Sequence, residues 1–309
     1  MREEELDRAA TILRCGGLVA IPTETVYGLG ANALDARAVA RVYEVKGRPA
    51  ESPLIVHVCS VEMARGLARV WPEGAGALAA RFWPGPLTMV VPKREVIPDI
   101  VTAGLDTVGL RLPAHAVMVE LIRRAGVPVA APSANRFTGL SPTTADHVRA
   151  AFGDALDMIL DGGPCEVGIE STVVSLAGAE PVLLRPGIVT REDLEAVLGR
   201  QVRVAGKVEG AHPSPGMHER HYSPRTPVFL VRDGRLPPGR GAYLWMRTSA
   251  RAEYEQRMPS DAASYARGLY GALHAADARN LDWIAVEPPP ETDEWAGVSD
   301  RLRRASCAG

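Results

Sequence analysis

A helical pattern, a loop rich in glycine and proline, and a short apolar segment follow one another between residues 35 and 58. Asp35 is a suitable N-cap for a helix whose apolar residues recur on one face, and Gly47 is a typical residue to end it. Prolines keep the next residues out of helix, and residues 54–58 have the apolar character of a buried strand. Because similar alternations continue along the chain, the sequence predicts a mixed α/β fold.

Two cations stand beside Gly47 at the start of this loop. Lys46 and Arg48 would point to the same side of an extended chain, because side chains alternate along it. Two fixed cations can hold a multiply charged anion such as a triphosphate. A solvated basic turn is the alternative, and it is the more frequent case for a Lys-x-Arg sequence taken by itself. We expect Arg48 to be exposed, so that its replacement would affect catalysis more than stability.

Helices and strands of both kinds are expected up to about residue 204. We predict helices at residues 3–15, 61–69, 74–82, 115–125 and 191–198, and strands at residues 18–21, 87–91, 108–112 and 127–131. Residues 170–172 open a further strand and Arg185 closes another, whereas residues 141–143 are expected to start a helix.

Two features of this region have alternative explanations. Residues 28–33 (GLGANA) fit a glycine-rich dinucleotide motif, but the glycines do not follow the strand directly, so we do not predict a dinucleotide site. Arg111 lies between Leu110 and Leu112 and therefore points away from them. It is either a surface arginine on an edge strand or a group that grips a carboxylate through two parallel hydrogen bonds.

The composition changes near residue 205. Residues 206–227 contain four prolines and three glycines with little apolar content, which predicts a linker. We favour solvated side chains over a metal site for its histidines, His212, His218 and His221. A small α/β unit then follows, with strands at residues 228–231, 242–246 and 283–286 and a helix at residues 262–276. The basic segment 301–304 is expected to be a solvated helix end.

The overall composition excludes several classes of protein. A net charge of −2 argues against a surface that binds nucleic acid throughout, although it says nothing of a local basic concavity. The N-terminus is acidic where a signal peptide would be basic, and no apolar run is long enough to cross a membrane. The scattered cysteines indicate neither a zinc site nor a disulfide framework, and we expect a cytoplasmic protein; they are Cys15, Cys59, Cys165 and Cys307.

Several ordered stretches resemble one known family. They are residues 21–30 (IPTETVYGLG), 46–49 (KGRP), 109–113 (GLRLP), 131–135 (APSAN), 170–174 (ESTVV), 184–187 (LRPG), 214–217 (SPGM) and 221–224 (HYSP). Together they resemble the YrdC-type threonylcarbamoyl-AMP synthases over residues 1 to about 225. The resemblance implies a YrdC-like twisted mixed sheet with helices over residues 1–204, a linker over residues 205–227, and a small Rossmann-like α/β domain over residues 228–309.

The resemblance also implies a reaction that joins L-threonine, bicarbonate and ATP. The threonine amine and bicarbonate would give a carbamate, whose oxygen attacks the α-phosphate of ATP and displaces pyrophosphate. Positioning and charge neutralisation dominate such transfers, and Mg²⁺ would be held mainly by ATP oxygens and water, without ligands from the protein. The product, threonylcarbamoyl-AMP, would pass to a tRNA threonylcarbamoyl transferase complex, with direct contact to tRNA left open.

Two alternatives to this activity stay open. A domain of the same fold could bind RNA on a basic concave face without catalysis. A related enzyme could instead make a carbamoyl adenylate from carbamoyl phosphate, but such relatives carry zinc-finger-like cysteine pairs and this chain has none.

The resemblance assigns site residues by their positions in the matching motifs. Phosphates would be held by Lys46, Arg48 and Ser52, of which Lys46 and Arg48 would be catalytic. The rest of the nucleotide would be held by Thr107, Ser133, Asn135, Ser141, Arg185 and Tyr222, with the linker folded back over it as a lid. Threonine would be held by Thr25, His57, Arg111, the Ala131 backbone and Ser171.

Overall fold

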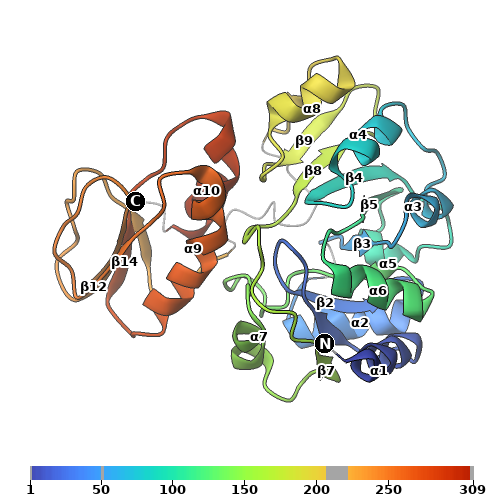
Figure 1. Ribbon diagram of the computed structural model, residues 1–309, viewed down its shortest axis with the longest axis horizontal. Helices are drawn as coiled ribbons and strands as arrows, with labels where there is room; N and C mark the ends of the chain where they lie inside the picture. Colours follow the sequence, from blue (N-terminus) through green and yellow to red (C-terminus); the bar gives the residue numbers. More distant parts are fainter. Residues whose placement is uncertain (1, 50–51, 207–221, 307–309) are drawn as a thin grey trace.

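The computed structural model describes residues 2–49, 52–206 and 222–306. In these ranges the chain forms a ten-stranded mixed sheet followed by a four-stranded parallel sheet. Figure 1 shows the two sheets in separate domains, with helices α9 and α10 of the second domain lying on the side that faces the first. The expected fold class, a mixed α/β domain followed by a small parallel α/β domain, is confirmed.

The large sheet mixes parallel and antiparallel neighbours in the order β10-β9-β8-β4-β5-β3-β6-β2-β1-β7. Its strands are β1 Val19–Ile21, β2 Gly28–Asn32, β3 Ile55–His57, β4 Leu87–Pro92, β5 Thr107–Arg111, β6 Val129–Ala130, β7 Met158–Ile159, β8 Thr172–Ser175, β9 Val182–Arg185 and β10 Arg203–Val204. Strand β3 runs parallel to β5, and β4 parallel to β8, whereas β4 and β5 are antiparallel. Residues far apart in sequence therefore meet near the ends of the central strands.

Helices pack against this sheet where the apolar periodicity predicted them. They are α1 Glu3–Arg14, α2 Ala36–Lys46, α3 Val61–Leu67, α4 Ala75–Phe82, α5 Asp99–Thr102, α6 Ala116–Ala125, α7 Ala145–Phe152 and α8 Arg191–Leu198. Helix α2 shows why the local signals were sufficient: the Asp35 side chain accepts hydrogen bonds from the first turn, and Gly47 ends the helix in the left-handed region at φ 62°. The short helix α5 was not predicted, and α7 begins at Ala145 after its N-cap Thr144 rather than at residues 141–143.

The glycine-rich stretch at residues 28–33 turns out to be strand β2. Its glycines are required by close packing, since a Cβ atom on Gly30 would lie 2.5 Å from Ile21 Cδ1 and 2.9 Å from Val129 Cγ1. Glycine inside a strand often marks such an approach, and its low strand propensity explains why the sequence pattern missed β2.

The C-terminal domain has the strand order β11-β14-β12-β13, with all neighbours parallel. Its elements are β11 Val228–Leu230, β12 Gly241–Trp245, β13 Tyr254–Arg257, α9 Ala262–Asp277, β14 Trp283–Val286, the 3₁₀ helix η1 Asp293–Trp295 and α10 Ala296–Ala305. Most of the linker, residues 207–221 with its three histidines, lies outside the described ranges, so the lid expected there is not placed.

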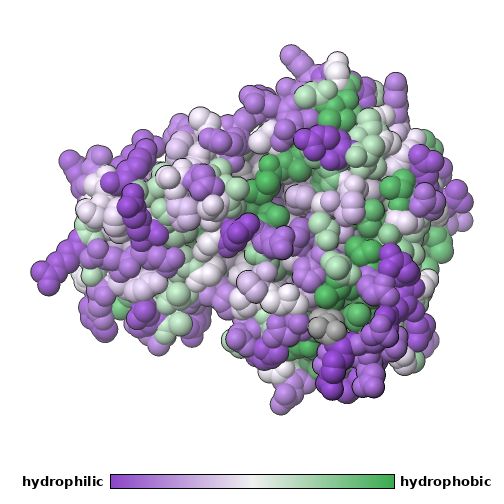
Figure 2. Space-filling view, in the orientation of Figure 1, coloured by the Kyte–Doolittle hydropathy of each residue, from purple (hydrophilic) through white to green (hydrophobic). Residues whose placement is uncertain are grey.

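The two domains are joined by a packed interface. Figure 2 shows their surfaces meeting above a notch in the outline of the molecule. An apolar cluster combines Val26, Leu140 and Ile169 of the first domain with side chains of α9 and α10. The prediction that residues 301–304 form a solvated helix end is wrong for Arg301, which is 1% exposed and forms an ion pair with Glu170. The apolar residues of α10 share its helical face, so this arginine is directed inward with them.

A glycine at the interface tests how closely the domains approach. A Cβ atom on Gly297 would lie 2.9 Å from the Cα atom of Gly187. We expect Gly297→Val to lower the free energy of unfolding by about 1–3 kcal/mol, because the added atoms overlap backbone that cannot move freely. Urea denaturation followed by circular dichroism measures the change.

Gly271→Ala is the matched control, since nothing lies within 4 Å of a methyl group added at that position of α9. It should leave stability unchanged or raise it by roughly 0.5–1 kcal/mol, because alanine favours helix over glycine. Equal stabilities of Gly297→Val and wild type would show that the domains do not approach this closely.

Candidate active site

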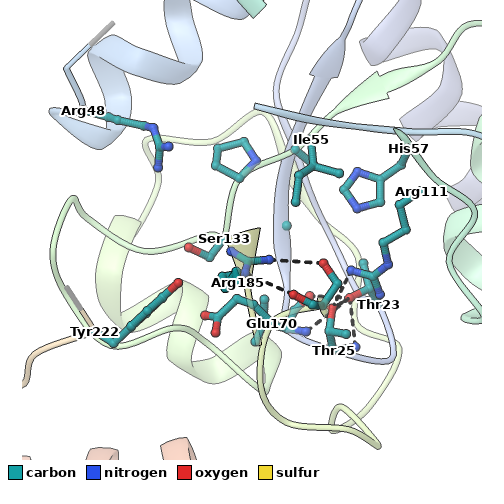
Figure 3. A pocket seen from close by; sticks show the side chains of 15 residues that line it. Thr23, Thr25, Arg48, Ile55, His57, Arg111, Ser133, Glu170, Arg185 and Tyr222 are labelled. Atoms are coloured by element: carbon teal, nitrogen blue, oxygen red, sulfur yellow. Dashed lines mark hydrogen bonds between the residues drawn. The ribbon is translucent and has the colours of Figure 1, made fainter. Parts of the chain in front are cut away.

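A pocket opens beside the ends of the central strands of the large sheet and encloses about 530 Å³, including solvent at its mouth. It is lined by Thr23, Thr25, Val26, Gly28, Arg48, Ile55, His57, Arg111, Ala131, Pro132, Ser133, Glu170, Ser171, Arg185 and Tyr222. In the close-up of Figure 3, Arg48 and Tyr222 lie on one side of the pocket, and His57 and Arg111 lie on the other.

Arg111 is held firmly at one end of the pocket. Its Nη1 donates to Thr25 Oγ1 at 2.9 Å, its Nε donates to the Gly85 carbonyl at 3.2 Å, and its Nη2 lies 2.8 Å from Glu24 Oε1. Because Arg111 is 3% exposed and lines the pocket, the alternative of a surface arginine on an edge strand is wrong. The guanidinium is paired with a carboxylate of the protein, but Nη2 makes no hydrogen bond with the residues that the structure describes. Because a guanidinium carries five N–H donors, Arg111 keeps donors for a further anion while these partners hold it in place.

His57 lies beside Arg111 because strands β3 and β5 pair these two residues in register. Burial of the ring, followed by the positive charge of Arg111, lowers the pKa of His57 to about 3. Its Nδ1 atom has no hydrogen-bond partner among the residues that the structure describes. The imidazole is therefore a neutral polar group, directed to a pocket in which a ligand could complete its hydrogen bonding.

Two further guanidinium groups line the pocket. Arg48 is 7% exposed, so the expectation of an exposed loop cation is wrong. Its Nη2 donates to the Pro53 carbonyl at 3.3 Å, and burial lowers the pKa of its guanidinium. Arg185 donates from Nε to the Ser171 carbonyl and from Nη2 to Ser171 Oγ, both at 3.1 Å. Figure 3 shows these two bonds to Ser171 as dashed lines.

Lys46 is not beside Arg48 on one face of an extended loop, as the alternation of side chains predicted. It is the last residue of α2, and its Nζ donates to the backbone carbonyls of Ser133 and Asn135. Burial, followed by the charges of Arg48 and Arg136, lowers the pKa of Lys46 well below its usual value. The amine therefore anchors the segment after β6 instead of lining the pocket.

The remaining predicted residues are divided between the pocket and its surroundings. Thr25, Ala131, Ser133, Ser171 and Tyr222 line it. Asn135 donates to the carbonyls of Arg136 and Gly139 just behind the wall that Ser133 forms.

Besides Lys46 and Asn135, three further predicted nucleotide contacts are not part of the lining. Ser141 donates its hydroxyl to Glu170. The Ser52 carbonyl accepts from the Tyr43 hydroxyl at 2.9 Å. Thr107 lies in a separate small cleft with Ile55 and Val173.

Sequence reasoning missed the two buried carboxylates of the site, Glu24 and Glu170, whose roles depend on distant arginines. Glu24 pairs with Arg111, and Glu170 pairs with Arg301 of the C-terminal domain. The available signal was their position inside the stretches IPTETVYGLG and ESTVV, where each adjoins residues assigned to the site.

Comparisons with known proteins identify the family of the chain. A family model described as "Telomere recombination" and named for Sua5, YciO and YrdC matches residues 11–187. A second model, "Threonylcarbamoyl-AMP synthase, C-terminal domain", matches residues 189–307. The chain is 43% identical to the threonylcarbamoyl-AMP synthase of Pyrococcus abyssi, over 99% of this chain and 95% of the relative. The chain belongs to the threonylcarbamoyl-AMP synthase family.

Other members of the threonylcarbamoyl-AMP synthase family match over nearly the same length. The enzyme of Bacillus subtilis is 40% identical over 98% of this chain and 93% of the relative. A solved structure of P. abyssi Sua5 complexed with L-threonine superimposes with a TM-score of 0.93 at 42% identity, covering 99% of this chain and 95% of that chain. Family membership thus extends through both domains, and the resemblance read from the sequence motifs is confirmed.

The lowered pKa of His57 gives a test by pH. The unfolded histidine takes up a proton near pH 6.5, whereas the folded one resists protonation to about pH 3. Stability should therefore fall as pH drops below 6.5, because the unfolded state then binds more protons. Between pH 7 and 4.5 we expect wild type to lose about 2 kcal/mol more stability than His57→Gln, measured by urea denaturation at each pH.

The contributions of the other titrating groups to the loss of stability cancel in this comparison, since wild type and variant share those groups. Identical losses of stability in the two proteins would show that His57 is protonated as easily in the folded state as in the unfolded chain.

Proposed function

We propose that this protein is an L-threonylcarbamoyladenylate synthase, which makes threonylcarbamoyl-AMP and pyrophosphate from L-threonine, bicarbonate and ATP. The observation that carries the proposal is a single pocket with Arg48 and Tyr222 on one side, Arg111 with His57 on the other, and Arg185 between them. Such a pocket can hold a polyanion next to an amino acid. The names of the relatives favour this activity over RNA binding without catalysis and over the use of carbamoyl phosphate.

Threonine would occupy the end formed by Thr25, His57, Arg111, the Ala131 backbone and Ser171. The P. abyssi structure was solved as a complex with L-threonine, which supports an amino-acid site in this fold. Arg111 would attract the α-carboxylate while Glu24 and Thr25 keep the guanidinium oriented. Neutral His57 would hydrogen-bond the amino acid without adding a charge that competes for its carboxylate.

ATP would occupy the end formed by Arg48, Ser133, Arg185 and Tyr222. Arg48 would neutralise phosphate charge, and Lys46 would contribute either by anchoring the Ser133 carbonyl, as here, or by exchanging that bond for a phosphate. Ser52, Asn135 and Ser141 would support the same end from behind the pocket wall, as would Thr107 from its neighbouring cleft.

The chemistry needs correct placement more than a protein nucleophile. The threonine amine adds to the carbon of bicarbonate, water is lost, and a carbamate forms. A carbamate oxygen then attacks the α-phosphorus of ATP, and the bond to the bridging oxygen of the β-phosphate breaks to release pyrophosphate. Because Arg185 binds both the carbonyl and the hydroxyl of Ser171, it links the ATP end to the threonine end and could hold the two substrates in line.

In this proposal Mg²⁺ enters the site bound to the phosphates of ATP. No group of three or more His, Cys, Asp or Glu side chains placed to hold a metal ion occurs in the described parts of the chain. Phosphate oxygens and water would supply most of the ligands of Mg²⁺, because this ion keeps several waters in proteins, and it would neutralise phosphate charge.

The cellular setting is also part of the proposal. Across residues 2–49, 52–206 and 222–306, no helix has the length and apolar character needed to cross a membrane. Cys15, Cys59 and Cys165 are free thiols, which is typical of a reducing compartment such as the cytosol. The product would be used there by a tRNA threonylcarbamoyl transferase complex.

Pyrophosphate release should require ATP, threonine and bicarbonate together. Each substrate is omitted in turn in a coupled pyrophosphate assay, with degassed buffer for the bicarbonate omission, because the carbamate cannot form without both its precursors. Radiolabelled bicarbonate should enter a product that also contains AMP and threonine. Equal pyrophosphate release without threonine would contradict the proposal.

Arg111→Lys should weaken threonine binding without weakening ATP binding. The ammonium cannot reproduce the two directed bonds of a guanidinium, and losing one charge-assisted bond costs about 1.5–3 kcal/mol, which is roughly tenfold to more than a hundredfold in affinity. Calorimetric titration of each ligand measures the two affinities. Arg123→Lys is the matched control, since the Arg123 side chain is 61% exposed on α6. Wild-type threonine affinity in Arg111→Lys would place the threonine site elsewhere.

A further inference from the structure

Glu170 is a carboxylate in the wall of a pocket that is proposed to bind a polyanion. It is 6% exposed, lies directly before Ser171 and lines the pocket between Arg185 and Tyr222. Its carboxylate accepts hydrogen bonds from the hydroxyl groups of Ser141 and Tyr270. An unneutralised charge at this position would repel the phosphates of ATP.

Arg301, from the last helix of the C-terminal domain, supplies the opposite charge. Its Nε lies 2.6 Å from Glu170 Oε2, and its Nη2 donates to the Glu170 carbonyl at 3.1 Å. Its Nη1 donates to the Pro186 carbonyl at 2.9 Å, and its guanidinium carbon lies 5.4 Å from the centroid of the Tyr222 ring. One fully buried side chain thus contacts three separate segments around the pocket.

Stabilisation of the interface between the domains does not by itself explain the ion pair between Glu170 and Arg301. A buried pair contributes little net stability, because desolvation of the two charges offsets their attraction. The domains already share an apolar cluster that includes Val26, Leu140 and Ile169, and more apolar contacts could have served the same purpose. What distinguishes the pair is that its carboxylate, Glu170, lines the pocket.

We propose that Arg301 is a positioning residue for the ATP site: it fixes the Glu170 carboxylate against the pocket wall and neutralises it, so that phosphates can enter between Arg48 and Arg185. The inference rests on the proposed synthase function and extends it, since it makes the C-terminal domain part of the active site. Arg301 acts through Glu170 and not by touching substrate.

The charges around Glu170 predict how the effect of removing Arg301 would depend on pH. The titratable groups that face it are Arg301 and Asp300 of α10, Tyr270 of α9, Arg185 of β9 and Tyr222. Burial raises the pKa of Glu170, but the charges of Arg301 and Arg185 and the bond from Ser141 outweigh it, so the net pKa is lowered. Wild-type Glu170 is therefore ionised between pH 6 and 8, and loss of Arg301 would raise its pKa.

The test compares Arg301→Gln with the double variant Glu170→Gln/Arg301→Gln in the pyrophosphate assay. Arg301→Gln should raise the KM for ATP by about tenfold to a hundredfold at pH 8, with a smaller change in the KM for threonine. The ratio of its KM to that of wild type should shrink as the pH falls, because loss of Arg301 raises the pKa of Glu170 and makes its carboxylate easier to protonate. The double variant should recover a KM near that of wild type and lose the extra pH dependence.

Arg303→Gln is the control, since it removes an arginine from the same helix whose side chain is 73% exposed and pairs with Asp300. It should behave as wild type. Thermal melts of all variants separate folding from kinetics. If Arg301→Gln alone does not fold, the double variant carries the test, because it leaves neither charge unpaired.

Two results would overturn the inference. One is a raised KM for ATP that persists in the double variant, which would mean that Arg301 does not act through Glu170. The other is a folded Arg301→Gln variant whose KM for ATP matches wild type at every pH. Failure of the synthase proposal itself would be distinct, since wild type would then release no threonine-dependent pyrophosphate.

Discussion

Burial of several cations around one pocket is the condition that the rest of the structure must satisfy. Lys46, Arg48, Arg111 and Arg185 are each at most 7% exposed. An ionised group taken out of water costs several kcal/mol unless protein groups replace its hydration. The fold meets this cost with backbone carbonyls for Lys46 and Arg48 and with a carboxylate for Arg111. The charged groups of the site are consequently held by protein partners before any substrate enters, which is what electrostatic preorganisation requires.

The order of strands in the mixed sheet determines which of these groups influence one another. Strand β3 pairs with β5 so that His57 lies opposite Arg111, and the charge of Arg111 adds to the burial of the ring in lowering the pKa of the imidazole. Strand β4 separates β5 from β8, and the Thr88 hydroxyl on β4 lies 2.8 Å from that of Ser171, which precedes β8. The sheet thus places the neutral ring of His57 on one side of the Arg111 guanidinium and the Ser171 hydroxyl on the other. A zwitterionic ligand would find both a cation for its carboxylate and uncharged hydrogen-bonding groups there.

Local signals in the sequence were sufficient to predict most helices and strands, but not the burial or the charge partners of the residues in them. The Asp35 cap and the Gly47 stop predicted α2 because they act within one turn of the helix. Strand β2 was missed because Gly30 has no side chain to contribute to an alternating pattern, and its role depends on side chains from two other strands. The burial of Arg48 was missed for a similar reason, since the walls around it come from residues as distant as Tyr222. Motif resemblance found the pocket residues, whereas their charge partners needed the tertiary structure.

The arginines of α10 show the limit of reading charge from composition. Arg301, Arg303 and Arg304 form one basic segment, yet their side chains are 0%, 73% and 15% exposed. Helical periodicity separates them, because Arg301 shares a face with the buried residues Val298 and Leu302, and that spacing was visible in the sequence. What the spacing could not supply was the partner, Glu170, which lies 131 residues away. Since the carboxylate belongs to one domain and its counter-ion to the other, the charge balance of the pocket is a property of the two-domain chain and not of the larger domain by itself.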